Sequence, residues 1–244
     1  MTKIDIISGF LGAGKTTLIK KLIEEAFTGE KLVLIENEFG EIGIDGGFLK
    51  DSGINITEMN SGCICCSLVG DFGTALAEVL EKYAPDRIII EPSGVGKLSD
   101  VIKAVLGVKE KVAGDSVVLN SFTTVADATK CKMYMKNFGE FYNNQVEHAG
   151  TIVLSRTGNM KEDKLQACID LIRTQNTEAS IITTPWDQIN GKQILDAMEK
   201  RNDLVKELLE EEDVCPECGH HHEHGEECDH DHEHHHHDHD EECG

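Results

Sequence analysis

The sequence predicts an α/β protein in which a mostly parallel sheet is flanked by helices. Short apolar runs of strand length alternate with longer segments whose apolar residues recur at helical spacing, and repeated strand–helix–strand units of this kind build parallel sheets. The alternation stops near residue 209, where a low-complexity tract rich in His, Cys and acidic residues begins. We therefore expect a folded domain at residues 1–209 and a tail at residues 210–244 that is disordered without a ligand.

Six short runs are rich in aliphatic and β-branched residues and are expected to be strands: Lys3–Ser8, Lys31–Ile35, Arg87–Glu91, Ser116–Val125, Thr151–Ser155 and Ser180–Thr183. Six other segments have apolar residues at helical spacing: Lys15–Phe27, Leu68–Tyr83, Leu98–Leu106, Lys130–Phe138, Glu162–Thr174 and Gly191–Leu209. The second of these helices ends before Pro85, because proline cannot continue a helix.

Length and composition fit an intracellular globular protein. The 244 residues are 39% hydrophobic, which is enough for a core, and no apolar run approaches the roughly 18 residues that a membrane helix needs. The amino terminus lacks the basic and apolar regions of a secretory signal. The nine cysteines are therefore expected to be reduced, in a cytoplasmic protein without a membrane partner.

The formal net charge of −22 is concentrated at one end of the chain. Residues 211–244 contain 14 Asp and Glu and no Lys or Arg, so that residues 1–210 carry a net charge of only −8. Nucleic acid is not an expected partner, because binding its phosphates requires the clustered Lys and Arg that the folded part lacks.

The segment Gly9-Phe-Leu-Gly-Ala-Gly-Lys-Thr16 matches the phosphate-binding pattern G-x-x-x-x-G-K-[ST] at every fixed position. It follows the first predicted strand and opens the first predicted helix, which is the context the motif requires. Backbone N–H groups would surround phosphate oxygens, Lys15 would reach the β- and γ-phosphates, and the Thr16 hydroxyl would ligate Mg²⁺. The expected nucleotide-binding residues are Gly9, Gly12, Ala13, Gly14, Lys15, Thr16 and Thr17. The sequence thus predicts a P-loop NTPase.

A second part of the phosphate site is expected where Arg87–Glu91 ends. An acid at the end of an apolar strand can approach the Mg²⁺ shell as a Walker-B acid does, so we assign Glu91 a catalytic role together with Lys15. Pro92-Ser-Gly94 then makes a turn in which the Gly94 amide can sense a γ-phosphate.

Three cysteines, Cys63, Cys65 and Cys66, lie within Asn60-Ser-Gly-Cys-Ile-Cys-Cys66. A disulfide is disfavoured in a reducing compartment, and a redox pair of Cys63 and Cys66 would have a third thiol between its members. Three soft ligands on one loop suit Zn²⁺ or another thiophilic divalent ion, with a fourth ligand from elsewhere. Buried thiols without a ligand are the alternative.

These motifs, together with Glu36-Asn-Glu-Phe-Gly-Glu41 and Glu91-Pro-Ser-Gly94, occur in the order seen in CobW-like GTPases, and the chain resembles that family over roughly residues 1–205. The Cys-x-Cys-Cys motif after a P-loop is the most specific mark of the resemblance. CobW-like proteins are relatives of the GTPases that help to load nickel into hydrogenase and urease. Membership implies a P-loop α/β fold, hydrolysis of GTP, and delivery or insertion of a divalent metal.

The resemblance also implies roles for residues that follow the second strand. Glu36–Asp45 corresponds by position to the first switch segment of the family, which rearranges between nucleotide states. Glu36 and Glu41 match acids that join the cysteines around a metal, and Asp45 matches an acid placed near Mg²⁺ and the attacking water. If metal ligands lie on loops that respond to the γ-phosphate, hydrolysis can change the affinity for the metal.

The chain departs from the family pattern at the segment that reads the base. The family has Asn-Lys-x-Asp at the end of a late strand, with the Asp pairing to the N1 and N2 donors of guanine, whereas this chain has Ser155-Arg156-Thr157-Gly158. Ser155 can replace the Asn and the Arg156 stem can stack on the base, but Gly158 cannot replace a carboxylate. GTP preference therefore rests on the resemblance, and ATP or low selectivity stays open. Trp186 is interpreted as a packing residue.

The tail holds 11 of the 12 histidines and four of the nine cysteines. Imidazoles at short spacing offer numerous weak, exchangeable sites for Zn²⁺, Ni²⁺ or Co²⁺. Alternatively, Cys215-Pro-Glu-Cys218 forms half of a structural zinc knuckle that another Cys or a His completes. The candidate ligands at the start of the tail are Cys215, Cys218, His220, His221 and His222.

We therefore expect a GTP-hydrolysing metallochaperone that uses GTP, Mg²⁺ and Zn²⁺ (or Co²⁺ or Ni²⁺) and delivers the metal to a client metalloprotein or cofactor-assembly enzyme. A nucleotide-dependent homodimer is kept open. Two alternatives remain: a metal storage or buffer protein with a vestigial nucleotide fold, and an accessory ATPase that activates a cofactor or a corrinoid protein. The intact Lys15, Thr16 and Glu91 favour turnover over buffering.

Overall fold

The computed structural model describes residues 1–36, 56–60, 69–108 and 116–200. Within these residues, seven strands form one sheet: β1 (Thr2–Gly9), β2 (Leu32–Glu36), β3 (Ile56–Asn60), β4 (Arg87–Glu91), β5 (Val117–Asp127), β6 (Thr151–Ser155) and β7 (Ser180–Ile182). The strands follow the order β3-β2-β4-β1-β5-β6-β7, and every neighbouring pair is parallel. The parallel α/β fold expected from the sequence is confirmed.

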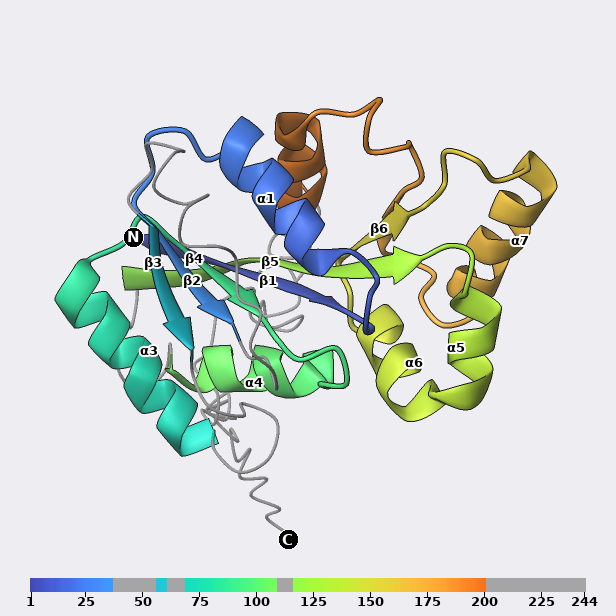
Figure 1. The fold of residues 1–244 in the computed structure, drawn as a ribbon. Coiled ribbons are helices and arrows are strands. Elements are labelled where there is room, and N and C mark those ends of the chain that lie inside the picture. The colour runs from blue at the N-terminus through green and yellow to red at the C-terminus, as the bar shows by residue number, and fades with distance from the viewer. Residues whose placement is uncertain (37–55, 61–68, 109–115, 201–244) are drawn as a thin grey trace, which may run out of the picture. The chain divides into compact units, whose positions relative to one another are not determined.

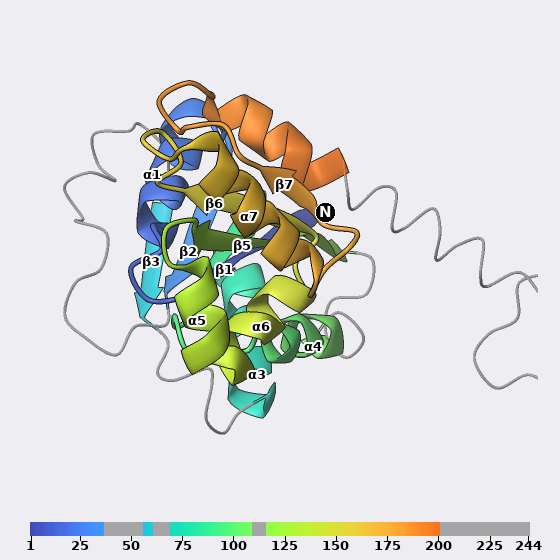
Figure 2. The same ribbon diagram turned by 90° about the vertical axis from the view of Figure 1, so that its right-hand side faces the viewer.

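Helices cover both faces of the sheet (Figure 1). The described helices are α1 (Lys15–Glu25), α3 (Val69–Tyr83), α4 (Leu98–Val108), α5 (Cys131–Asn137), α6 (Gly139–Glu147), α7 (Glu162–Arg173) and a helix at residues 191–200. Figure 1 shows α1 and the helix at 191–200 on one face and α3 and α4 on the other, and Figure 2 shows α5 and α6 on the same side as α4. None of the helices in the described part of the chain combines the length and the apolar character that a bilayer-spanning segment requires.

Alternate residues of the central strand β1 supply the cores on the two faces of the sheet. Ile4 and Ile6 are fully buried in the cluster that includes α4 and α6, whereas Ile7 is fully buried in the cluster that includes α1 and the helix at 191–200. Successive side chains of a strand point to opposite faces, so a strand covered on both sides must be apolar on both. Each buried side chain of this size contributes about 1.5–3 kcal/mol to folding.

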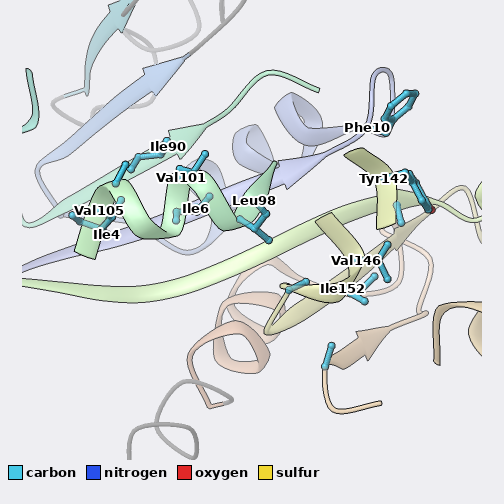
Figure 3. Close-up of a cluster of buried hydrophobic side chains, with 14 of the residues drawn as sticks. Ile4, Ile6, Phe10, Ile90, Leu98, Val101, Val105, Tyr142, Val146 and Ile152 are labelled. Atoms are coloured by element: carbon cyan, nitrogen blue, oxygen red, sulfur yellow. The ribbon is translucent and has the colours of Figure 1, made fainter. Parts of the chain in front are cut away.

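The larger of the two clusters joins the sheet to the helices on one face (Figure 3). Val101 and Val105 of α4 lie over Ile6 and Ile90, which belong to the adjacent strands β1 and β4. This packing holds the two central strands and α4 as one unit, and it fixes the positions of the loops that follow these strands.

The sequence did not predict β3 and α6. β3 is an edge strand with polar Thr57 and Glu58 in its middle, and it is defined by its in-register pairing with β2 rather than by a continuous apolar run. In α6, several residues have modest helix propensity, but Tyr142, Gln145 and Val146 are buried at helical spacing. Tertiary packing therefore decides the conformation of this segment.

The other elements begin and end close to the expected residues. Of the predicted helix at Gly191–Leu209, the structure describes the part up to residue 200. The division of the chain at residue 209 and the disorder of the tail lie outside the described residues and stay predictions.

A buried ion cluster joins β1, β4 and the helix at 191–200. Arg87 is 2% exposed and forms ion pairs with Asp5, Glu30 and Glu199. Asp5, which is fully buried in the middle of β1, also accepts a hydrogen bond from Asn120 at 2.8 Å. A buried charge is costly unless it is paired and hydrogen-bonded, and this cluster meets that requirement.

Candidate functional site

The first glycine of the P-loop and four polar residues lie at the edge of the sheet where the strands end. Gly9, Glu36, Glu91, Asp127 and Ser155 are the last residues of β1, β2, β4, β5 and β6. Glu36 pairs in register with Glu91, and Asp127 pairs with Ser155. β1 lies where the chain connections change direction, with β4 and β2 on one side and β5 on the other. Open α/β sheets bind their ligands at such a point, so this edge is the candidate site.

The loop between β1 and α1 depends on its glycines. Gly9, Gly12 and Gly14 have φ values of 148°, 69° and 106°. At Gly9, a Cβ would lie only 2.3 Å from the carbonyl oxygen of Val125 on β5. Gly14 caps α1 in the left-handed region that favours glycine. The loop predicted from the motif therefore lies directly before the amino terminus of α1, where the helix dipole favours phosphate.

Phe10 anchors this loop in the hydrophobic core. Its ring is 4% exposed and its centroid lies 4.6 Å from that of Tyr134 and 6.1 Å from that of Tyr142. The N–H of Ala13 donates a hydrogen bond to the carbonyl oxygen of Phe10 at 3.1 Å, which closes the turn. The loop is thus positioned by aromatic packing at its start and by α1 at its end.

Lys15, Thr16 and Glu91 come together at the start of α1. The Thr16 hydroxyl donates a hydrogen bond to Glu91 Oε1 at 3.1 Å, and Lys15 Nζ lies 3.9 Å from the same oxygen. The Lys15 and Glu91 side chains are only 10% and 4% exposed, so that their electrostatic interactions are screened less than at the surface. Hydroxyl and carboxylate oxygens are ligands that Mg²⁺ prefers, and this pair of side chains fits that ion.

The turn after β4 touches the P-loop. A Cβ at Gly94 would lie 2.8 Å from the backbone nitrogen of Leu11, so only glycine allows this approach. Gln145 of α6 is fully buried, and its Nε2 donates hydrogen bonds to the carbonyl oxygens of Gly94 and Gly96 at 3.1 and 2.8 Å. Sequence reasoning missed Gln145 because a single glutamine carries no functional signal. Its complete burial and its two loop contacts identify it.

A pocket of about 340 Å³ lies beside the P-loop, within the range of roughly 300–1,000 Å³ that is usual for ligand sites. The structure brings together five predicted nucleotide-binding residues in its lining: Ala13, Gly14, Thr17, Ser155 and Arg156. The other lining residues are Thr157, Gly158, Pro185, Trp186 and Asp187. The last three follow β7, in a loop to which the sequence assigned no role in the site. Trp186, interpreted as packing, packs against the core and also lines the pocket.

Arg156 links this pocket to the P-loop. Its Nη2 donates a hydrogen bond to the carbonyl oxygen of Gly12 at 2.9 Å, and its Nη1 lies 3.1 Å from Asp127 Oδ2. The Asp127 side chain is 1% exposed, so it provides a buried counter-charge for the half-exposed guanidinium. Asp127 was also missed from the sequence, although an acid that ends an apolar strand, as at Glu91, was the available signal.

Most candidate metal ligands lie outside the described residues. These are Glu41, Cys63, Cys65, Cys66, Cys215, Cys218, His220, His221 and His222, together with the candidate catalytic residue Asp45. Glu36 is described, is 5% exposed and lies next to Glu91 in the sheet. The described residues contain no group of three or more His, Cys, Asp or Glu side chains that could hold a metal ion. Of the expected zinc site, the structure therefore places Glu36.

Comparisons with known proteins show which sequences and folds this chain resembles. The sequence pattern of the family "CobW/HypB/UreG, nucleotide-binding domain" matches residues 3–183. The zinc chaperone CobW of a Sinorhizobium species is 33% identical, with 92% of this chain and 69% of that protein covered. The zinc-regulated GTPase metalloprotein activator 1 of Schizosaccharomyces pombe is 28% identical over 79% of this chain, which spans about half (48%) of that relative.

A solved structure has the same fold. The Zn(II)-bound YjiA GTPase of Escherichia coli superposes with a TM-score of 0.55 and 23% identity, over 78% of this chain and 62% of that one. The family match covers the P-loop, the turn after β4 and the strand that ends at Ser155. This chain therefore belongs to the CobW/HypB/UreG family of P-loop GTPases, as its motifs predicted, and is a nucleoside triphosphatase by membership of that family.

Proposed function

We propose that this chain is a metallochaperone that holds Zn²⁺ as cargo, hydrolyses GTP, and uses hydrolysis to release the metal to a client metalloprotein. The observation that carries the proposal is the in-register pairing of Glu36 with Glu91 at the ends of β2 and β4. Adjacent strands lie about 4.8 Å apart and paired residues point to the same face. A candidate metal ligand is thus next to the candidate catalytic acid of the nucleotide site.

The nucleotide chemistry follows from the cluster at the start of α1. Lys15 binds the β- and γ-phosphates, and the backbone N–H groups of the P-loop surround the phosphate oxygens. Thr16 and Glu91 hold Mg²⁺, which when bound neutralises charge that develops on the phosphates. The Gly94 amide, on the turn that touches Leu11, contacts the γ-phosphate. The pocket lined by Ser155 and Arg156 takes the base.

The cargo site combines ligands from the segment that begins at Glu36 and from the cysteine motif at residues 60–66. Cys63, Cys65 and Cys66 provide thiolates, and Glu36 and Glu41 provide carboxylates, as the resemblance implies. Glu36 ends β2 directly before the candidate switch segment, so any movement of that segment on loss of the γ-phosphate changes the ligand set. The tail at residues 210–244 collects metal for this site.

The names of the relatives support zinc as the cargo and a protein as the recipient. The bacterial relative is named a zinc chaperone, the fission yeast relative a zinc-regulated GTPase metalloprotein activator, and the structural neighbour is Zn(II)-bound. Because the chain spans only part of these proteins, the client and the full delivery reaction belong to the proposal.

Hydrolysis of GTP and ATP, each measured with and without Zn²⁺, tests this function. The full chain should turn over GTP, and Zn²⁺ should change the rate. Lys15→Ala should lower kcat about 10²- to 10³-fold, because it removes one electrostatic donor to the transition state. Lys164→Ala, at an exposed position of α7, is the matched control and should leave the rate unchanged.

Two results would contradict the proposal. Normal turnover by Lys15→Ala would exclude the P-loop as the catalytic site. A chain that binds Zn²⁺ tightly but hydrolyses neither nucleotide would instead be the metal buffer with a vestigial nucleotide fold.

A further inference from the structure

Among the residues that line the pocket beside the P-loop, only Asp187 has a carboxylate. It is exposed, and within the described part of the chain its side chain takes part in no hydrogen bond or ion pair. Among the lining residues the one cation is Arg156, and it interacts with Asp127 and with the carbonyl oxygen of Gly12. The Asp187 carboxylate is therefore available as an acceptor for a ligand in the pocket.

The neighbouring Trp186 gives the same pocket a fixed aromatic wall. Its Nε1 donates a hydrogen bond to the carbonyl oxygen of Leu154 at 2.9 Å. The edge of its ring lies against the P-loop, since a Cβ at Gly14 would be 3.2 Å from Trp186 Cη2. An aromatic ring of this kind can stack with a nucleobase, so the loop after β7 provides both a stacking surface and an acceptor.

The pocket also contains a polar group whose hydrogen bonding is incomplete. Thr157 is 6% exposed, and its hydroxyl oxygen has no hydrogen-bond partner among the residues that the structure describes. Buried polar groups are nearly always paired in folded proteins. Together with Asp187, this hydroxyl indicates that the pocket is built for a ligand with polar edges.

We infer that Asp187 reads the base of the bound nucleotide and selects guanine over adenine. Guanine presents N–H donors at N1 and N2 that one carboxylate can accept together, whereas adenine presents an unprotonated ring nitrogen at N1, which repels a carboxylate. Asp187 thereby supplies, from the loop after β7, the acid that Gly158 cannot provide in the segment after β6. The inference rests on the proposed function in that the pocket takes the base of GTP.

The exposure of Asp187 limits how strongly it can favour GDP over ADP. Hydrogen bonds to a charged group that remains in contact with water are weaker than the same bonds in a dry pocket. We expect the wild-type chain to bind GDP about 10- to 100-fold more tightly than ADP, below the roughly 10⁴-fold that a buried, fully satisfied readout reaches.

Equilibrium binding of GDP, ADP and xanthosine diphosphate to Asp187→Asn tests the inference. The amide oxygen of Asn can still accept from N1–H, but its NH₂ faces the N2 amino group of guanine and instead matches the O2 carbonyl of xanthine. The variant should lose about 10- to 100-fold in GDP affinity and gain affinity for xanthosine diphosphate. It should bind ADP no more weakly than the wild type does, because the repulsion between the carboxylate and adenine N1 is removed. Asp196→Asn, exposed on the helix at 191–200 and outside the pocket, should change none of the three.

A second substitution, combined with the first, tests whether a carboxylate in the pocket is what selects guanine. A Cβ at Gly158 would meet only the Pro185 ring, with Cβ at an ordinary 3.6 Å and Cγ at 3.9 Å, so we expect Gly158→Asp to be tolerated. Added to Asp187→Asn, it should restore preference for GDP, because the new carboxylate can accept hydrogen bonds from the same N1 and N2 donors of guanine.

An unchanged GDP-to-ADP ratio in Asp187→Asn, or a wild-type chain that binds ADP as tightly as GDP, would overturn the inference. Neither result would affect the proposed hydrolysis, because the assay measures binding of diphosphates without turnover. Conversely, a chain that lacks hydrolysis but shows the switch to xanthosine diphosphate would refute the proposed function and keep Asp187 as the base reader.

Discussion

The Thr16 hydroxyl donates a hydrogen bond to the Glu91 carboxylate at 3.1 Å, although 75 positions separate these residues in the chain. The contact joins the amino terminus of α1 to the end of β4. On the other side of β4, Glu91 is paired with Glu36 in β2. One buried acid therefore lies between the P-loop and the strand that ends at the candidate metal ligand Glu36.

Replacing Glu91 with Gln should slow hydrolysis and weaken the binding of Mg²⁺. The amide keeps the shape of the side chain but removes the charge beside Lys15 and Thr16. We expect kcat to fall at least about 10²-fold and the half-saturating Mg²⁺ concentration to rise. Steady-state kinetics over a Mg²⁺ titration measure both, with the exposed Glu162→Gln as control. An unchanged Mg²⁺ requirement would show that another residue is the acid.

Replacing Gln145 with Glu should weaken the binding of nucleoside triphosphates but not of nucleoside diphosphates. The new carboxylate would face the carbonyl oxygens of Gly94 and Gly96 and displace the turn that touches the P-loop. We expect the affinity for a non-hydrolysable GTP analogue to fall about tenfold, the cost of losing roughly one such hydrogen bond, while GDP binding stays unchanged. Gln175→Glu, at an exposed position, is the control. Equal losses for both nucleotides would mean that Gln145 is only structural.

The two candidate metal sites should respond differently to mutation. Replacing Cys63, Cys65 and Cys66 with Ser should remove one tight Zn²⁺, because thiolates on a folded loop are strong ligands, and should uncouple Zn²⁺ from hydrolysis. Truncation after Leu209 should remove several weaker ions, because each must order a flexible acidic chain. Calorimetry on both variants measures the number and affinity of bound Zn²⁺ ions, and hydrolysis assays measure whether Zn²⁺ still changes the rate. If truncation removes the tight site, the tail and not the cysteine motif contains the functional metal site.

Replacing Glu199 with Gln should destabilise the fold in a pH-dependent way. Burial opposes the charged form of Glu199, but hydrogen bonds from Lys3, Asn120 and Arg87 outweigh it and lower the pKa of this carboxyl. A lowered pKa contributes stability above the unfolded pKa, and this stability is lost as the pH falls through the folded value.

The wild type should therefore exceed Glu199→Gln by about 1–2 kcal/mol in free energy of unfolding at pH 7, and the difference should shrink below about pH 4. Urea unfolding at several pH values measures it, with the exposed Glu24→Gln as control. A difference that is independent of pH would mean that the lost contribution is packing rather than charge.

The sequence by itself determined the features that depend on neighbouring residues. The P-loop is a local motif between one strand and one helix, so its position in the chain was predictable from order and spacing alone. The apolar runs identified six of the seven strands in the described residues, because a strand buried on both faces must be apolar throughout. Glu91 ends one of these runs, so its position at the end of a strand was predictable as well.

Only the tertiary structure decided which of these local features meet. Chain order and spatial order differ in this sheet: β4 lies between β2 and β1, which places Glu36 beside Glu91. Gln145 reaches the Gly94 turn through a helix that is defined by packing rather than by propensity, and Asp187 enters the pocket through a loop more than 170 residues after the P-loop. Contacts of this kind depend on how the elements pack against one another. They cannot be predicted from the spacing of residues along the chain.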